Sequence, residues 1–245
     1  MKHPEYARSL LSERLFPGDC ALCGTLLLDM KECWYGLCQA CMSRVRLDLA
    51  LEPRCSVCGR PLVSEQGVCM SCREKNVRHT FDRTLALFPY SGLYRDLLVA
   101  FKFGKRRALG NFFAERLLEG LAYLPYGGDG MALTPVPPRP GKLKAGGWDQ
   151  IACLAGILER MRRVEPLCPP VCRCLKRLPS RSQKELGGEA RKTNLQGKFS
   201  SISKAPRRVI VFDDVITTGS TLDACADALK ADGADVVYGL CLFYD

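Results

Sequence analysis

The stretch that decides the fold is Val209-Ile210-Val211-Phe212-Asp213-Asp214-Val215-Ile216-Thr217-Thr218-Gly219-Ser220-Thr221. Its four leading apolar residues predict a buried parallel strand that ends at two carboxylates, and the Thr/Gly/Ser turn leads into a predicted helix. Such a turn presents backbone N–H groups and hydroxyls at a helix N-terminus, where phosphate is favoured. The carboxylates suit ribose hydroxyls or a bound Mg²⁺. The sequence therefore predicts a site for a phosphorylated sugar at the end of a strand.

Two other interpretations share part of this pattern. One is a buried strand followed by a solvated turn and a capped helix. The other is the Walker B strand of an ATPase, which needs a Walker A loop. The candidates Gly104-Lys105, Gly141-Lys142 and Gly197-Lys198 do not complete one. The stretch instead resembles the phosphoribosyl-pyrophosphate (PRPP) motif of type I phosphoribosyltransferases. That resemblance implies that Asp213 and Asp214 hold the ribose hydroxyls, and that the 5′-phosphate is held by Thr217, Thr218, Gly219, Ser220 and Thr221.

Length and composition indicate a globular protein. The 245 residues, 47% of them hydrophobic, can bury the core of one large or two smaller domains. Leu10-Leu11 is interrupted at once by Ser12-Glu13-Arg14, which is unlike a signal peptide, and no run approaches the ~18 apolar residues of a membrane helix. We therefore expect a cytoplasmic protein without a membrane span, in which 15 cysteines indicate metal binding before disulfides.

The net charge of +10 is unevenly distributed. Residues 142–208 hold 16 Lys and Arg against 5 Asp and Glu, an excess of +11, whereas residues 209–245 hold 1 Lys against 7 Asp, or −6. This basic excess directly before the phosphate turn would attract a polyphosphate sugar or a nucleic-acid backbone. A solvated basic face is the alternative.

Eight cysteines form four Cys-x-x-Cys pairs, and two such pairs complete a tetrahedral Cys₄ zinc site. Their spacing predicts two successive ribbon-like hairpins that bind one or two Zn²⁺ ions, with sequential pairing favoured over interleaved pairing. Zinc can staple a region too small for its own core, or it can shape a surface for DNA. The predicted ligands are Cys20, Cys23, Cys38, Cys41, Cys55, Cys58, Cys69 and Cys72.

The remaining pattern predicts a helix and zinc module over residues 1–80 and an α/β domain over residues 81–245. Helices are expected at 4–16, 93–103, 108–123, up to 163 and after the motif, and strands at 81–90, 131–138 and 236–243. A glycine-bearing polar segment, 177–199, is expected to be a mobile loop that closes over the ligand. The candidates for a pyrophosphate or hood contact are Lys102, Lys142, Lys144, Arg181, Gln183, Arg191 and Asn194.

Taken in order, these features resemble the ComF competence family over the whole chain. The carrying motifs are Cys58-Gly59-Arg60-Pro61, Pro135-Val136-Pro137, the spaced Gln183…Arg191…Asn194…Phe199 and Asp213-Asp214…Thr221. The resemblance implies a zinc ribbon on a type I phosphoribosyltransferase-like parallel sheet flanked by helices, and a link to DNA uptake or nucleotide metabolism. The chain departs from the family at Gly146-Gly147-Trp148-Asp149-Gln150, where members usually read Arg-Gly-Phe-Asn-Gln. The missing arginine and the added acid weaken this loop as a pyrophosphate clamp.

Three functional hypotheses follow. In the first, the chain is a phosphoribosyltransferase that binds PRPP with Mg²⁺ and transfers its ribosyl group to a nitrogenous base or ammonia. In the second, it handles single-stranded DNA, contacts the DNA-uptake machinery, and keeps the PRPP pocket as a sensor or a relic. The third is a zinc-stapled scaffold for partner proteins. The acceptor is not predicted, because nothing in the sequence indicates a purine or pyrimidine pocket. No general base is predicted either, because the two histidines, His3 and His79, lie far from the motif in sequence.

Overall fold

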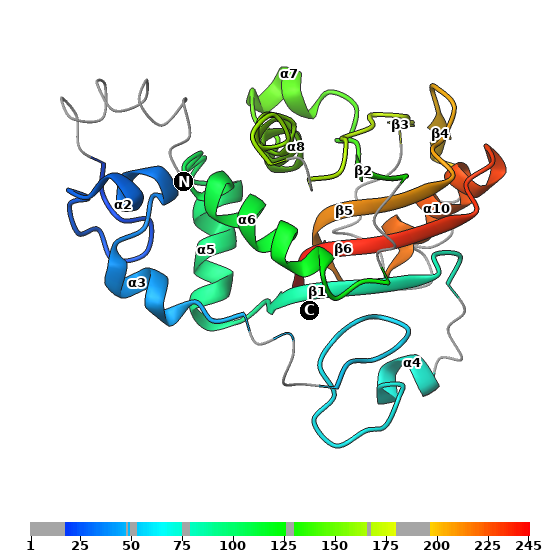
Figure 1. Cartoon of the computed structure of the whole chain (residues 1–245), viewed down its shortest axis with the longest axis horizontal. Coiled ribbons are helices and arrows are strands. Elements are labelled where there is room, and N and C mark those ends of the chain that lie inside the picture. The colour runs from blue at the N-terminus through cyan, green and yellow to red at the C-terminus, as the bar shows by residue number, and fades with distance from the viewer. Residues whose placement is uncertain are drawn as a thin grey trace.

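The computed structural model describes residues 18–47, 49, 53–74, 79–125, 130–165, 168–179 and 197–245. Two small zinc-ribbon modules accompany an α/β domain (Figure 1). The helix expected over residues 4–16 and most of the expected loop at 177–199 lie outside the described residues.

The centre of the α/β domain is a four-stranded parallel sheet with the strand order β1-β6-β5-β2. The mostly parallel α/β fold expected from the sequence is therefore confirmed. These strands read as nearly continuous apolar runs because the sheet is covered on both faces. Their bounds are β1 Arg83–Pro89, β2 Met131–Pro135, β5 Arg208–Ile216 and β6 Val236–Tyr244.

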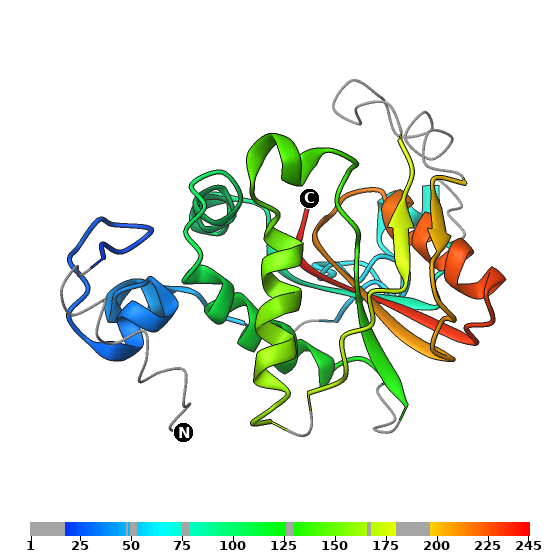
Figure 2. The ribbon, with the colours of Figure 1, turned by 90° about the horizontal axis from the view of Figure 1, so that it is seen from above.

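Helices α5 (Gly92–Lys102), α6 (Leu109–Leu121) and α8 (Gln150–Met161) cover one face of the sheet. The other face carries α10 (Ser220–Ala231) and an antiparallel pair, β3 (Leu175–Arg177) and β4 (Phe199–Ser201) (Figure 2).

Strand β5 supplies alternate residues to the two cores. Ile210 and Phe212 belong to the cluster under α6 and α8, whereas Val209 and Val211 belong to the cluster under α10. Successive side chains of a strand point to opposite faces. The same alternation sends the neighbouring carboxylates at 213 and 214 to opposite sides of the sheet.

Two local expectations differ from the structure. Strand β5 does not end at the carboxylates, because Val215 and Ile216 continue the ladder beside Phe243 and Tyr244 of β6. The expected glycine-bearing loop after β2 contains a short helix, α7 (Lys142–Gly146). Its N-cap is Gly141, in the left-handed region at φ 80°.

The first ribbon, with α2 (Met30–Tyr35) and α3 (Gln39–Arg44), shares a core with the α/β domain. Leu37 is fully buried in the cluster that also contains residues of α6. The Tyr35 hydroxyl donates to Glu115 at 2.6 Å, and Arg106 forms an ion pair with Asp19 at 2.6 Å. These contacts cross the boundary predicted at residue 80, and the domain division itself stays a prediction.

The second ribbon, with α4 (Met70–Glu74), has a small core of its own around its four cysteines and Leu62. It docks on the outer edge of β1. Arg54 Nη1 donates to the carbonyl of Ala86 at 2.7 Å, and a Cβ at Gly59 would lie 2.4 Å from the Thr84 carbonyl oxygen. The ribbon therefore covers a sheet edge that would otherwise expose unpaired backbone groups. Among the helices in the described ranges, none has the length and apolar character needed to cross a bilayer.

Candidate functional site

The eight predicted metal ligands form two separate Cys₄ clusters. Within each cluster the four Sγ atoms lie within 4.8 Å of one another. Cys23 and Cys38 approach to 3.6 Å and Cys58 and Cys69 to 3.7 Å. A tetrahedral zinc–thiolate site has an S–S edge of about 3.8 Å for a Zn–S bond of about 2.3 Å. The geometry therefore fits Zn²⁺, and the sequential pairing is confirmed.

Backbone N–H groups around the second cluster favour thiolate, the form that binds zinc. The amides of Cys58 and Cys69 lie 3.5 and 3.4 Å from Cys55 Sγ. Against the effect of burial, these hydrogen bonds lower the pKa of the Cys55 thiol to about 7. Burial raises the pKa of Cys58 to about 11, so a metal ion is needed to keep all four thiols of this cluster ionised at neutral pH.

At the carboxyl end of β5, Asp214 lies on the side covered by α5 and α8. Its Oδ2 accepts from Lys102 Nζ at 2.5 Å and from Gln150 Nε2 at 2.6 Å, and the residue is only 7% exposed. Burial would raise the pKa of this carboxyl, but the charge of Lys102 and the two hydrogen bonds hold it below its usual value. Asp214 is therefore an ionised carboxylate that Lys102 and Gln150 hold in place.

Asp213 lies on the opposite side, toward α10, and is half-buried. Its Oδ1 accepts the backbone N–H of Asp214 at 2.8 Å. Burial and the adjacent negative charge of Asp214 raise its pKa well above the ordinary value. A cation or a set of ligand hydroxyls at this position would bring Asp213 into its ionised form.

The Thr/Gly/Ser turn joins β5 to α10 and forms a small hollow of about 40 Å³, lined by Asp213 and residues 215–222. Gly219 is the N-cap of α10, at φ 76°. Thr218 Oγ1 and Ser220 Oγ lie 2.8 Å apart, so these hydroxyls hydrogen-bond to each other across the turn. The hollow thus places Asp213 next to hydroxyls and helix N-terminal amides, as the sequence predicts for a phosphate cradle.

His79 contacts this turn, although nothing in the sequence spacing indicates it. Its Nδ1 lies 2.8 Å from Asp223 Oδ2, its ring stacks on Phe81 at 4.3 Å, and the backbone N–H of Thr80 donates to Asp223 Oδ1 at 2.8 Å. A Cβ at Gly219 would lie 2.8 Å from His79 Cε1. Residues 79–81, which follow the second ribbon, therefore pack against the turn and support it.

Arg177, at the end of β3, is a second residue that the motif does not reveal. Its guanidinium lies 5.2 Å from the Phe199 ring centroid, and its buried Nε and Nη2 have no hydrogen-bond partner among the described residues. Burial and the nearby positive charge of Arg139 lower its pKa, whereas Asp213 acts in the opposite direction. A half-buried guanidinium close to an acid suits an anionic ligand.

The residues predicted to contact pyrophosphate or to form the hood do not all lie at the acidic pair. Lys142 Nζ binds Asp149 Oδ2 at 2.6 Å and Gln150 Oε1 at 2.9 Å, so the acid that distinguishes this loop from the family pattern neutralises a lysine of the same loop. Lys144 is exposed on α7. Of the hood candidates, Lys102 alone contacts the acidic pair within the described ranges. The remaining four lie outside the described residues: Arg181, Gln183, Arg191 and Asn194.

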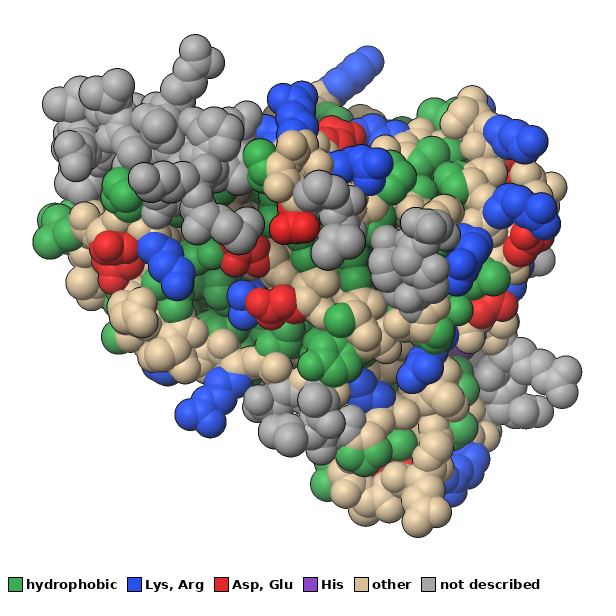
Figure 3. All heavy atoms as spheres, viewed as in Figure 1, with side chains coloured by type: hydrophobic (Ala, Val, Ile, Leu, Met, Phe, Trp, Pro, Cys, Tyr) green, Lys and Arg blue, Asp and Glu red, His purple; other side chains and the backbone are tan. Residues whose placement is uncertain are grey.

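The surface charge does not form one continuous basic patch on the face shown in Figure 3. Lys and Arg side chains gather over α7 and α8 and around β4 and α10, with acidic side chains between them.

Known proteins resemble this chain along most of its length. The family model described as "Double zinc ribbon domain" matches residues 11–74. "Competence protein F" of Haemophilus influenzae is 27% identical over 215 residues, which is 82% of this chain and 87% of that protein. "DNA utilization protein YhgH" of Escherichia coli K12 is 26% identical over 235 residues, 92% of this chain and 96% of the relative. The protein of the same name from Salmonella typhi is 25% identical over 233 residues. The expected resemblance to competence proteins is thus confirmed, and the N-terminus is a double zinc ribbon.

Proposed function

We propose that this homologue of competence and DNA-utilisation proteins binds PRPP with Mg²⁺ at the carboxyl end of its parallel sheet and acts there as a phosphoribosyltransferase. Asp213 and Asp214 hold the ribose hydroxyls, and the turn from Thr217 to Thr221 holds the 5′-phosphate. Ligands of open α/β sheets bind at this edge.

The observation that carries the proposal is the arrangement of the two acids. They lie on opposite sides of β5, near the end of the strand that leads into the left-handed Gly219 turn at the N-terminus of α10. One is held by Lys102 and Gln150, and the other borders the hollow of the turn. The side chains also fit the proposed ligand, because carboxylates suit Mg²⁺ and the Arg177 guanidinium suits a phosphate group.

In this proposal each group has a defined task. The turn binds the phosphate, the acids orient the ribose, and a nitrogen nucleophile forms a bond to the anomeric carbon as the bond to pyrophosphate breaks. Mg²⁺ would neutralise the pyrophosphate leaving group. The ion pair with Asp149 neutralises Lys142, so we expect slow turnover compared with tight binding.

Calorimetry with PRPP and Mg²⁺ tests the binding. We expect the wild-type chain to bind and Asp213→Asn, which keeps the shape of the side chain, to bind at least 10-fold more weakly. Asp235→Asn is the matched control, because Asp235 forms an exposed ion pair with Arg207 at 2.6 Å just before the first residues of β5 and β6, at the opposite end of these strands from Asp213. No binding by the wild type, or equal binding by the two variants, would refute the assignment. A pyrophosphate-release screen with bases and ammonia then tests transfer.

A second candidate is that the chain handles single-stranded DNA and uses PRPP as a regulatory ligand. The names of its relatives and the +11 charge of residues 142–208 favour this second candidate. This candidate predicts a DNA affinity that falls steeply with salt and no pyrophosphate release with any acceptor. DNA affinity that is absent, or that is insensitive to salt, counts against it.

A further inference from the structure

A second cavity, of about 560 Å³, lies in the seam between the first ribbon and the α/β domain. We call it the seam pocket. Its walls come from α2 of the ribbon, from the start of α6 and the residues just before it, and from α7, α8 and the loop between them. It shares no lining residue with the hollow of the phosphate turn. Its volume is within the range of small-molecule sites, roughly 300–1,000 Å³.

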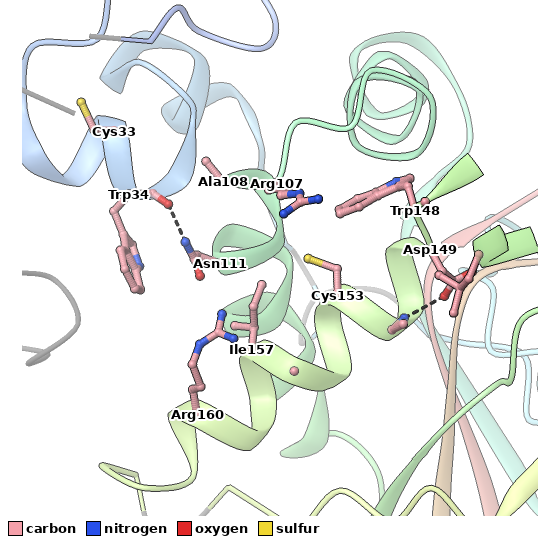
Figure 4. Close-up of a pocket in the computed structure, with 14 residues that line it drawn as sticks. Cys33, Trp34, Arg107, Ala108, Asn111, Trp148, Asp149, Cys153, Ile157 and Arg160 are labelled. Atoms are coloured by element: carbon pink, nitrogen blue, oxygen red, sulfur yellow. Dashed lines mark hydrogen bonds between the residues drawn. The ribbon is translucent and has the colours of Figure 1, made fainter. Parts of the chain in front are cut away.

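Both tryptophans of the chain line this pocket. Figure 4 shows Trp34 and Trp148 on its two sides, with the guanidiniums of Arg107 and Arg160 between them in this view. Trp148 is 8% exposed and packs edge-on against Phe101, with Arg107 5.5 Å from its ring centroid. Trp34 is the more exposed indole, and its carbonyl accepts from Asn111 Nδ2 at 2.8 Å. The pocket therefore offers aromatic surface anchored to both modules.

Two guanidiniums belong to the pocket. Arg107 and Arg160 are exposed at its rim. Asp149 is the one acid among the described lining residues, and its carboxylate is already engaged by Lys142 and by the backbone N–H of Ala152. At Gly156 on α8, an added Cβ would meet only Arg160 Nη1, at 3.8 Å. Among the described residues, the floor at Gly156 is therefore open beside the Arg160 guanidinium.

We propose that the seam pocket binds a nucleotide, with its base against the indole of Trp34 and its phosphate between Arg107 and Arg160. Indole faces accept any base by stacking, and guanidiniums bind phosphate oxygens in pairs. The nucleotide is either a free nucleoside phosphate or one unit of a single strand. The proposal deepens the DNA-handling candidate by naming its site, and it does not depend on PRPP binding.

Tryptophan fluorescence reports directly on this site, because both fluorophores line it. The zinc-loaded full chain is titrated at low salt with thymidine monophosphate, with short oligothymidylate and with a duplex of the same length. Quenching by either of the first two supports the site and identifies the source of the nucleotide. Absence of quenching by both overturns the proposal, as does equal quenching by the duplex, whose bases are already stacked.

Variants then locate the ligand. Trp34→Ala should weaken affinity roughly 5- to 150-fold, and Trp34→Phe, which keeps a ring, should weaken it less. Arg160→Gln should lower the salt slope for oligothymidylate by about 0.7. Arg163→Gln is its control, since Arg163 is also exposed but does not line the pocket.

Gly156→Leu fills the floor without removing any side chain and is compatible with a helix, so it should abolish quenching in a chain that still folds. Wild-type affinity in Gly156→Leu, or equal loss in Arg160→Gln and Arg163→Gln, would overturn the proposal. Calorimetry of PRPP on the wild-type chain is read separately. If nucleotide quenches the fluorescence but PRPP gives no heat of binding, the seam-pocket proposal is supported and only the PRPP site is refuted.

Discussion

Replacing Gly219 with alanine should damage the phosphate turn through two separate effects. The residue has φ 76°, where an ordinary side chain costs about 1–2 kcal/mol. The new Cβ would also lie 2.8 Å from His79 Cε1. Moving that ring aside costs free energy, because it is hydrogen-bonded to Asp223 and stacked on Phe81. Overpacking of this kind costs about 1–3 kcal/mol, so we expect a total loss of about 2–5 kcal/mol.

Gly141 provides a matched control within the same chain. It is also a helix N-cap in the left-handed region, at φ 80°, but a Cβ there would meet nothing within 4 Å. Gly141→Ala should therefore show the backbone cost alone, about 1–2 kcal/mol. Urea unfolding of zinc-loaded chains, followed by circular dichroism with the slope m held in common, measures the difference.

A third variant identifies the source of the contact. In a His79→Ala background, Gly219→Ala should cost no more than Gly141→Ala does in the wild type. Equal losses for the two glycine variants in the wild-type background would refute the reasoning, because they would show that His79 does not constrain the turn. PRPP titration of Gly219→Ala should show weaker binding, since the support of the turn is displaced.

Three further outcomes are expected. Burial and the charge of Asp214 raise the pKa of Asp213 above 3.8, so binding of PRPP and Mg²⁺ should release a proton and should weaken as the pH falls through that raised pKa. Calorimetry in two buffers of different ionisation heat detects the released proton. In Asp213→Asn this proton release should be absent. Lys102→Met leaves Asp214 buried without its counter-charge and should cost about 3 kcal/mol at pH 7, the low end for a buried pair because the lysine side chain is 30% exposed. That loss should shrink as pH falls and Asp214 is protonated, and unchanged urea stability at pH 7 would contradict the assigned ion pair. Chelation of zinc should remove hydrogen-exchange protection from residues 53–74 more than from the first ribbon, because the second ribbon packs mainly around its own cysteines; equal loss in both would contradict this.

The pH dependence of stability follows from the same acid. The pKa of Asp214 is lowered in the folded chain. A carboxyl with a lowered folded pKa contributes stability that is fully present above its unfolded pKa and is lost as pH falls through the folded value. Lys102→Met should therefore flatten the acid limb of the stability curve.

Local spacing made the ribbons and the phosphate turn predictable. A Cys-x-x-Cys turn places two thiolates on one metal ion regardless of the rest of the chain, so pairs such as Cys20/Cys23 could be assigned from the sequence. The strand, acid pair, glycine turn and helix at 209–221 are likewise contiguous, and their contacts span only a few residues. The limits of local reasoning already show in β5, whose ladder with β6 extends to Ile216 beyond the expected end.

Only the tertiary structure decided which distant side chains complete the sites. Lys102 reaches Asp214 across 112 positions, and His79 reaches Asp223 across 144. Such contacts depend on the strand order β1-β6-β5-β2, in which β6, the last strand of the chain, lies between β1 and β5. Periodicity shows that a strand has two apolar faces, but it does not show which helix covers each face. By itself, the sequence therefore determined the zinc clusters and the strand, acid pair and glycine turn at 209–221, whereas packing determined the opposite environments of Asp213 and Asp214 and the seam that joins the two tryptophans.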